Sequence, residues 1–277
     1  MQLIHTVAEL RQRLAQQTSI SFVPTMGNLH AGHLHLAKLA RQRGQCVVVS
    51  IFVNPLQFGV NEDLANYPRT LAEDCAKLEA AGVDIVFAPS ENEIYPVPQS
   101  MMVTPPPIAN ELCGASRPGH FSGVATVVLK LFNLVQPQVA VLGKKDFQQL
   151  YIIRELTRQF NLPIEIVAGE TIREADGLAM SSRNGYLSRE ARAQASQLHQ
   201  SLQQVVQSVQ AGQTDYVAAE AQAAAWLAQA GWTVDYISIR SANTLLRPTP
   251  VENALVVLGA ARLEATRLID NIEFKQA

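Results

Sequence analysis

The chain has 277 residues, of which 48% are hydrophobic and 17% are charged, and its formal net charge is −2. This composition is typical of a globular protein with one large domain or two modest ones, and it excludes a disordered or fibrous chain. A nucleic-acid-binding protein needs clustered Lys and Arg side chains to neutralise phosphates, and the sequence has no long basic run. We therefore expect no nucleic-acid partner, although a local cluster of donors would suffice for a small anion.

The apolar runs of the sequence have the length of β-strands, well below the roughly 20 residues of a membrane-spanning helix. Residues 1–14 mix acidic and basic side chains at helical spacing, without the continuous apolar segment of a signal peptide. Cys46, Cys75 and Cys113 form no CxxC pair, which argues against a disulfide framework and against a zinc site. We expect a cytoplasmic protein that has no membrane partner.

The first 170 residues alternate short apolar runs with amphipathic stretches. The apolar runs predict strands at residues 20–24, 45–53, 83–88, 139–142 and 164–167. The amphipathic stretches predict helices at residues 33–43, 68–81, 123–135 and 146–160. Strands that are separated by such helices are typical of a mostly parallel sheet covered on both faces. Residues 91–107 interrupt this rhythm with five prolines, and we expect an excursion with an edge strand there.

After Arg183 the composition changes. The Ala- and Gln-rich stretches predict two helices at residues 188–211 and 215–230, and the apolar runs that follow predict strands at residues 234–239, 255–260 and 266–270. Helices followed by strands indicate a second, smaller α+β domain. We therefore predict two domains, an α/β domain at residues 1–169 and an α+β domain at residues 170–277.

Residues 24–33, with the sequence PTMGNLHAGH, directly follow the first strand of the predicted parallel sheet. A glycine-containing turn leads into a helix that opens at His30 and His33, three residues apart on one helical face. The unpaired N–H groups at a helix N-terminus attract anions, so both imidazoles are placed to contact one phosphate group. Two alternatives are a pair of capping or surface histidines and a zinc site, although the pattern has no third ligand and no Glu of the HExxH kind.

Two further segments contain the residue types of a polyphosphate site. The GKKD segment, residues 143–146, follows a predicted strand and combines a glycine with a lysine for phosphate and a carboxylate for ribose hydroxyls. The MSSR segment, residues 180–183, combines two hydroxyls with a guanidinium, which together can clamp a polyphosphate. Taken alone, each segment is more simply a solvated turn or a linker.

Together, the three segments resemble the HIGH and KMSKS signatures of nucleotidylyl transferases and class I aminoacyl-tRNA synthetases, which break the α–β phosphate bond of a nucleotide. Longer matches resemble the pantothenate synthetase family and stand in family order over most of residues 20–190. These matches are PTMGNLHAGH, SIFVNPLQFG, DLANYPRTLAEDC, LCGASRPGHFSGVATVV, GKKDFQQL and MSSRNGYLS. The sequence departs from the family at Lys144, where an acidic or amide residue is usual.

The resemblance implies a Rossmann-like N-terminal domain that binds ATP and pantoate, a smaller C-terminal lid domain, and a homodimer. It implies that ATP, pantoate and β-alanine give pantothenate, AMP and pyrophosphate through a pantoyl-adenylate, with Mg²⁺ accompanying ATP. An adenylate is easily hydrolysed, so the lid would carry the MSSR segment over the nucleotide and exclude water.

The resemblance also implies roles for individual residues. The catalytic residues would be His30, His33, Lys145 and Arg183, with His33 as the proton donor. The ATP-binding residues would be Met26, Gly27, Asn28, Leu29, His30, Ala31, Gly32, His33, Gly143, Lys144, Lys145, Asp146, Ile172, Met180, Ser181, Ser182 and Arg183. The side-chain amides of Gln57 and Gln149 would bind pantoate and β-alanine, because an amide both donates and accepts hydrogen bonds. Asn54 is a weaker candidate for phosphate or Mg²⁺, no dedicated metal cage is expected, and Arg117 and His120 receive no chemical role.

Three alternative functions differ in their chemistry. Another HxGH nucleotidylyl transferase would need no amine as a second substrate. A catalytically silent nucleotide-binding regulator would not need every polar position of the site, yet all of them are filled here. A tRNA ligase is disfavoured because the sequence shows no anticodon-binding domain and no basic surface.

Overall fold

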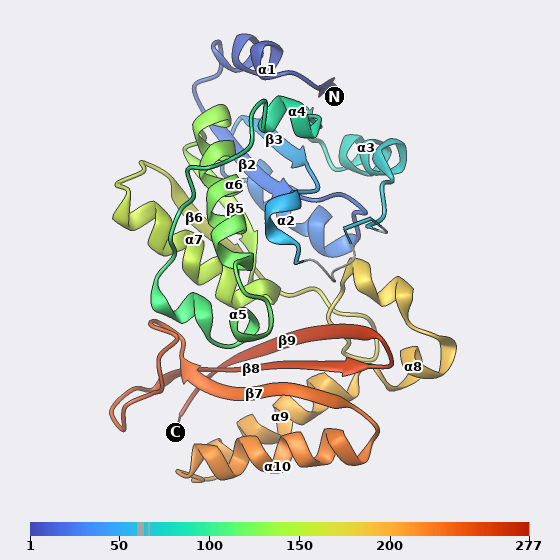
Figure 1. Cartoon of the computed structure of the whole chain (residues 1–277), viewed down its shortest axis with the longest axis vertical. Helices are drawn as coiled ribbons and strands as arrows, with labels where there is room; N and C mark the ends of the chain where they lie inside the picture. The colour runs from blue at the N-terminus through green and yellow to red at the C-terminus, as the bar shows by residue number, and fades with distance from the viewer. Residues whose placement is uncertain (60–63, 66, 277) are drawn as a thin grey trace.

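The structure is a computed structural model that describes residues 1–59, 64–65 and 67–276 (Figure 1). Asp63 and Asn66 of the DLANYPRTLAEDC motif lie outside the described residues. The described residues form a six-stranded sheet and a three-stranded sheet, which lie one below the other in Figure 1.

The larger sheet is parallel throughout and has the strand order β1-β4-β3-β2-β5-β6. Its strands are β1 (Gln2–Ile4), β2 (Ile20–Thr25), β3 (Cys46–Ile51), β4 (Ile85–Phe87), β5 (Val139–Gly143) and β6 (Glu165–Gly169). From β2 the chain builds outward through β3 to β4, which lies beside the edge strand β1, and then returns to the other side of β2 with β5. Ligands of such sheets bind beyond the carboxyl ends of the strands, beside the point where the order reverses. The predicted parallel α/β sheet is confirmed, and β1 is an additional strand that the sequence pattern did not predict.

Helices cover both faces of this sheet because its strands are apolar on both sides. Successive side chains of a strand point to opposite faces, so Phe22 and Val48 belong to one core and Val23 and Val49 to the other. The helices around the sheet are α1 (Val7–Leu14), α2 (Ala31–Arg41), α3 (Leu71–Ala80), α6 (His120–Val135) and α7 (Phe147–Gln159). The core that contains Phe22 also takes in apolar residues of α1, α6 and α7, whereas the core that contains Val23 takes in apolar residues of α2 and α3.

Two predicted elements are wrong. Residues 91–107 contain no edge strand: the short helix α4 (Glu91–Ile94) is followed by irregular chain up to a 3₁₀ turn at Pro107–Asn110. Proline has no N–H to donate to a neighbouring strand, which explains why this segment does not pair. Residues 188–211 form two helices in place of one, α8 (Arg189–Gln194) and α9 (Gln197–Gln210).

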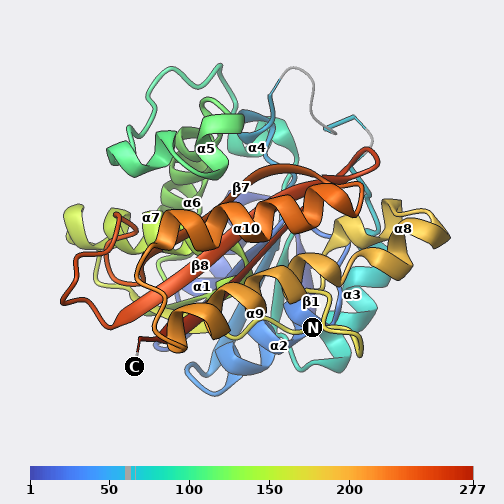
Figure 2. The same cartoon turned by 90° about the horizontal axis from the view of Figure 1, so that it is seen from below.

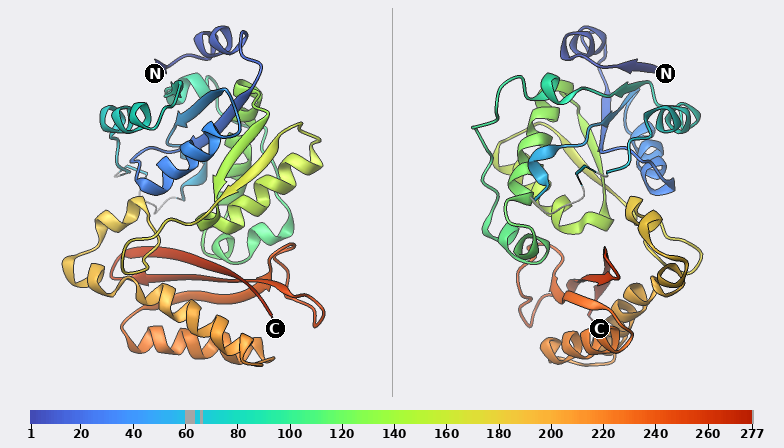
Figure 3. Two further views of the ribbon diagram at one scale, coloured as in Figure 1. Left: turned by 180° about the vertical axis from the view of Figure 1, so that it is seen from behind. Right: turned by 45° about the vertical axis from the view of Figure 1, so that its right-hand side comes forward.

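The smaller sheet is antiparallel, with strands β7 (Thr233–Ser241), β8 (Ala254–Leu263) and β9 (Thr266–Lys275) in that order. Helices α9 and α10 (Tyr216–Gln229) cover one face of it, as the view from below shows (Figure 2). The other face turns toward the larger domain (Figure 3), where Val256 and Leu258 of β8 pack with Ile108, Leu112 and Phe147. The predicted α+β class of this part is confirmed.

No helix within residues 1–59, 64–65 and 67–276 is both long enough and apolar enough to cross a membrane.

Candidate active site

A cavity of about 220 Å³ lies at the carboxyl ends of β2, β3 and β5. The segment that connects the two domains closes one side of it through residues 170–172 and 180–183. The cavity brings His33, Lys145 and Gln149 together, although these residues belong to three separate segments of the sequence. The sequence-predicted residues that line it are Met26, His30, Gly32, His33, Gln57, Gly143, Lys145, Asp146, Gln149, Ile172, Met180, Ser181, Ser182 and Arg183.

The two histidines open helix α2 and form a reciprocal cap. His30 is the N-cap residue, and its Nδ1 accepts a hydrogen bond from the backbone N–H of Gly32 at 3.2 Å. The Nδ1 of His33 accepts from the backbone N–H of His30 at 3.3 Å, and the two ring centroids are 4.1 Å apart. A Cβ at Gly32 would lie 2.9 Å from the His30 ring, so any larger residue at this position would displace that ring.

This cap determines the charge and the tautomer of both rings. Burial, followed by the positive charge of Lys145, lowers the pKa of His30 to about 4; burial, followed by the charges of His30 and Lys145, lowers the pKa of His33 to about 3. Because each Nδ1 accepts a backbone hydrogen bond, each proton must lie on Nε2. At neutral pH the pair is therefore uncharged and presents two Nε2–H donors.

The turn before α2 is held by a buried carboxylate from helix α3. Asp74 accepts hydrogen bonds from the backbone N–H groups of Asn28 and Leu29, both at 2.8 Å. Gly27 and Asn28 have positive φ angles of 86° and 50°, which glycine and asparagine tolerate better than other residues. The ammonium of Lys77 donates to the carbonyl of Leu29 at 2.9 Å. Sequence patterns did not predict this support, because Asp74 lies more than 40 residues away from the turn.

The GKKD segment is fixed from the smaller domain. The side-chain amide of Asn271, on β9, donates to the carbonyls of Lys144 and Lys145, both at 2.9 Å. The ammonium of Lys145 lies 3.7 Å from a carboxylate oxygen of Asp146. Burial opposes the ionisation of Asp146, but the positive charges of Lys145 and Arg183 outweigh it and lower its pKa.

Lys144 does not line the cavity. Its ammonium lies 2.6 Å from carboxylate oxygens of both Glu170 and Glu273. Burial opposes its charge, but these two hydrogen-bonded carboxylates outweigh that effect and raise its pKa. The lysine that departs from the family pattern therefore bridges the larger domain, the connecting segment and β9.

The connecting segment contacts both domains. Ser182 Oγ donates to the carbonyl of Asn28 at 3.1 Å, which joins the MSSR segment to the turn before α2. Earlier in the segment, Arg173 donates two hydrogen bonds to the buried carboxylate of Asp270, at 2.6 and 2.9 Å. His199 Nδ1 also lies 3.1 Å from Asp270. The hydroxyls and the guanidinium of the MSSR segment thus face the cavity from a chain that is anchored at both ends.

Another part of the cavity lining combines two amides, those of Gln57 and Gln149, with an apolar wall. Gln57 is buried, its Oε1 accepts from Asn54 Nδ2 at 3.1 Å, and its Nε2 donates to Met26 Sδ at 3.1 Å. Asn54 is 1% exposed, and its Oδ1 accepts a hydrogen bond from the Tyr95 hydroxyl at 2.8 Å. These bonds let Asn54 position Gln57; Asn54 also lines the cavity, and its contact with phosphate or Mg²⁺ stays a prediction. The apolar wall consists of Phe52, Val124, Val127, Val128 and Leu131.

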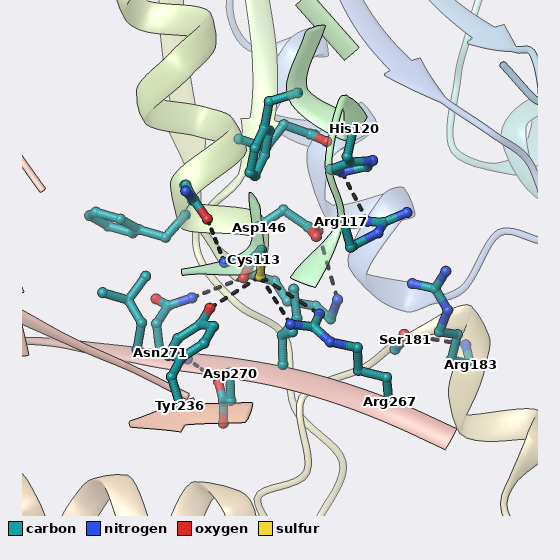
Figure 4. A pocket seen from close by; sticks show the side chains of 17 residues that line it. Cys113, Arg117, His120, Asp146, Ser181, Arg183, Tyr236, Arg267, Asp270 and Asn271 are labelled. Atoms are coloured by element: carbon teal, nitrogen blue, oxygen red, sulfur yellow. Dashed lines mark hydrogen bonds and ion pairs between the residues drawn. The ribbon is translucent and has the colours of Figure 1, made fainter. Parts of the chain in front are cut away.

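A smaller chamber of about 50 Å³ adjoins this cavity between the two domains (Figure 4). It shares Lys145, Asp146, Gln149, Ser181 and Arg183 with the larger cavity. Its other polar side chains include Cys113, Arg117, His120, Tyr236 and Arg267. The Cys113 thiol lies 3.1 Å from the Tyr236 hydroxyl, and burial raises the pKa of Tyr236.

Five of the residues implied by the family resemblance do not line the cavity: Gly27, Asn28, Leu29, Ala31 and Lys144. The first four form the turn and the start of α2, where contact with a nucleotide would come from the backbone, and their ATP-binding role stays a prediction. No three His, Cys, Asp or Glu side chains gather as a metal site in the described ranges 1–59, 64–65 and 67–276.

Comparisons with known proteins identify the family of the chain. Residues 2–273 match the family model of pantoate–β-alanine ligase. A pantothenate synthetase from Methylobacillus flagellatus is 67% identical over 274 residues, which is 99% of each chain, and one from Thiobacillus denitrificans is 59% identical over 278 residues, or 100% of this chain and 98% of that one.

Solved structures give the same result. The crystal structure of pantothenate synthetase from Thermus thermophilus has a TM-score of 0.92 and 44% identity, covering 98% of this chain and 99% of that one. The pantoate–β-alanine ligase from Francisella tularensis, complexed with β-γ ATP and β-alanine, has a TM-score of 0.83 and 34% identity, covering 98% of this chain and 97% of that one. The chain therefore belongs to the pantoate–β-alanine ligase family.

Proposed function

We propose that this chain joins pantoate to β-alanine with cleavage of ATP, giving pantothenate, AMP and pyrophosphate. Membership of the family supports this reaction, and so does the ligand content of the Francisella tularensis relative. The observation that carries the proposal is a single cavity that is lined both by phosphate-type donors and by two glutamines with an apolar wall. The alternatives of a different nucleotidylyl transferase and of a silent regulator are not favoured by relatives of this identity and coverage.

The first step activates the acid. A carboxylate oxygen of pantoate attacks the α-phosphorus of ATP, and the bond from that phosphorus to the pyrophosphate oxygen breaks, which leaves pantoyl-adenylate. Negative charge develops on the phosphate oxygens during this step. His30 and His33 donate to those oxygens through Nε2–H, while Lys145 and Arg183 supply positive charge. Such preorganised donors are each often worth about 10²–10³-fold in rate.

The lowered pKa values refine the role of His33. A ring that is neutral at pH 7 acts first as a hydrogen-bond donor. The negative charge of bound triphosphate raises the pKa of a nearby imidazole, so His33 gains basicity only once ATP is in place. In this way His33 is suited to share its Nε2 proton with the departing pyrophosphate.

The second step forms the amide. The amine of β-alanine attacks the acyl carbon of pantoyl-adenylate, the carbon–oxygen bond to AMP breaks, and the nitrogen loses a proton. Gln57 and Gln149 are suited to hold pantoate, because an amide matches both its hydroxyls and its carboxylate. The aliphatic side chains of α6 that line the cavity are suited to its gem-dimethyl group.

Mg²⁺ would enter as the complex of ATP with magnesium. Mg²⁺ usually keeps several waters and binds through substrate phosphates with one or two carboxylates. Asp146, which is ionised and beside Lys145, is the side chain suited to that mode, and no further protein ligand is needed. When bound, the ion neutralises charge on the leaving pyrophosphate.

The remaining assignments are proposals on the organisation of the protein. The end of β6 at Gly169 supports a domain boundary between residues 169 and 170, with residues 170–277 acting as a lid. The free state of Cys46, Cys75 and Cys113 supports a reducing compartment, the cytoplasm. The homodimer rests on the family resemblance, and light scattering on the purified chain tests it.

Isotope exchange tests the proposed reaction. With ATP, Mg²⁺ and pantoate but no β-alanine, labelled pyrophosphate should exchange into ATP, and AMP should accumulate only after β-alanine is added. Exchange without pantoate would indicate a different acid substrate, whereas AMP release that does not depend on an amine would indicate a transferase. Nucleotide binding without any exchange would indicate a regulator.

A further inference from the structure

His120 is the first residue of α6 and Arg117 lies three residues before it, and the proposed mechanism uses neither of them. Arg117 Nη1 donates to His120 Nε2 at 2.9 Å, an interaction drawn in Figure 4. The Nδ1 of the same ring donates to the backbone carbonyl of Gln57 at 2.8 Å, and Arg117 Nη2 lies 3.5 Å from that carbonyl. His120 is 8% exposed, so its ring is held almost entirely inside the protein.

These contacts fix the tautomer of His120. A guanidinium has donors and no acceptor, so the His120 Nε2 that faces it must be unprotonated. The single proton of the neutral ring therefore lies on Nδ1, where it points at the Gln57 carbonyl. Arg117 thus selects the ring form that binds Gln57.

The backbone of Gln57 is restrained from a second direction as well. A Cβ at Gly123 would lie 2.1 Å from the carbonyl oxygen of Leu56, so the backbone of α6 packs directly against the backbone of residues 56 and 57. The side-chain amide of Gln57 is held separately by Asn54. The position of the Gln57 amide in the cavity therefore depends on both its side-chain and its backbone hydrogen bonds.

We propose that Arg117 and His120 are positioning residues that orient Gln57 for the organic acid substrate. They act through the backbone of Gln57, and they set the apparent affinity for pantoate while leaving ATP binding unchanged. This role rests on the proposed function, in which Gln57 contacts pantoate.

Two amide substitutions at residue 120 distinguish the role of Nδ1 from the role of Nε2. In His120→Asn, the amide nitrogen stands where Nδ1–H stood and keeps the bond to the Gln57 carbonyl. In His120→Gln, the amide extends toward the position of Nε2 and loses that bond. We expect His120→Gln to raise the KM for pantoate roughly tenfold in the exchange assay, the worth of one buried hydrogen bond, whereas His120→Asn stays within about threefold of wild type.

Arg117 provides an independent variant, because it is only partly buried and its replacement leaves the core intact. Arg117→Met should raise the KM for pantoate about threefold or more, since His120 can then adopt the other tautomer. In the His120→Asn background the same change should have little effect, because asparagine has no second tautomer. The KM for ATP should stay within about twofold of wild type in all of these variants.

Ser122→Ala is the matched control. Ser122 lies on the same helix and its hydroxyl donates to the carbonyl of Val103 at 2.7 Å, without contact to Gln57. We expect it to lower the thermal midpoint and to leave the KM for pantoate unchanged. An equal rise of that KM in Ser122→Ala, equal effects of Asn and Gln at position 120, or a wild-type KM in Arg117→Met would each overturn the proposal.

The failure of the proposed function gives a different result. If wild type catalyses no pantoate-dependent exchange, the proposed reaction is wrong, and the positioning role falls with it. If wild type is active and the variants at Arg117 and His120 keep its KM for pantoate, only the positioning role is wrong. If His120→Gln does not fold, the KM for pantoate of Arg117→Met, alone and combined with His120→Asn, decides whether the positioning role is correct.

Discussion

Two groups of residues line the cavity and are built in different ways: the phosphate-type donors, here called the phosphate end, and Gln57 and Gln149 with the apolar wall, here called the acid end. The phosphate end uses three segments, namely the His30–His33 cap and the GKKD and MSSR segments, each of which is a short local run of the sequence, and both domains hold it in place through Asn271 and Ser182. The acid end uses residues that are distant in sequence, yet all of them belong to the larger domain. We infer that the position of the smaller domain controls the nucleotide and the chemistry much more than it controls the binding of the acid.

Removal of the smaller domain tests this difference most severely. A chain that ends at Asn184 keeps both cores of the parallel sheet and the acid end, but it loses β9 with Asn271. We expect pyrophosphate exchange to disappear completely while calorimetry still detects pantoate binding. Circular dichroism should show a folded domain of lower solubility, because Ile108, Leu112 and Phe147 lose their apolar cover. Full exchange activity in the truncated chain would refute the lid.

Neighbouring lysines test the phosphate end. Lys145→Met removes the ammonium that lines the cavity and should lower kcat/KM for ATP about 10²–10³-fold, with the Kd for pantoate unchanged. Lys144→Met removes a side chain that pairs with Glu170 and Glu273, and it should stay within about fivefold of wild type, because partly exposed ion pairs contribute little. Steady-state kinetics measures both. Equal losses in the two variants would mean that Lys144, as the family resemblance implies, also serves ATP through its side chain.

The sequence predicted the phosphate end well because its chemistry is local. A helix N-terminus, a strand-end glycine and a run of hydroxyls can each be read within ten residues, and the cavity contains all three. The supports of these groups could not be predicted in this way. Asp74, Asn271 and the Arg173–Asp270 pair bind residues that are far away in the sequence. The sequence around a single Asp or Asn does not indicate which distant group it will bind.

The same reasoning explains the errors in the fold. Strands β2, β3 and β5 were predicted because each is a mostly apolar run that is largely buried on both faces. Strand β1 has only three residues, which is too short for a recognisable strand pattern. Its pairing with β4 depends on tertiary contacts that cannot be predicted from its own sequence. The segment 91–107 has apolar and extended residues that resemble a strand, but its prolines cannot join a ladder.

Removal of one contact between the domains, the side-chain amide of Asn271, should have a smaller effect on activity. Asn271→Ala removes two hydrogen bonds to the carbonyls of Lys144 and Lys145, so the lysine turn loosens. We expect kcat/KM for ATP to fall roughly tenfold, with the KM for pantoate unchanged, as two neutral hydrogen bonds would give. Asn253→Ala, at an exposed asparagine just before β8, is the control and should behave as wild type. A rise in the KM for pantoate would contradict the separation of the two ends.

The smallest effect at working pH concerns the stability of the phosphate end. In the unfolded chain the two histidines have ordinary pKa values near 6.5, whereas in the folded chain the values are about 4 and about 3. Between these limits the unfolded state binds more protons, so the free energy of unfolding should fall as the pH drops below 6.5 and be constant above it. We expect a loss of about 2 kcal/mol between pH 7 and pH 5, measured by urea unfolding, after allowance for partial exposure of the rings. In a His30→Asn, His33→Asn double variant, whose amide oxygens replace both Nδ1 acceptors, that part of the pH dependence should vanish, and its persistence would show that the rings are not buried as neutral donors.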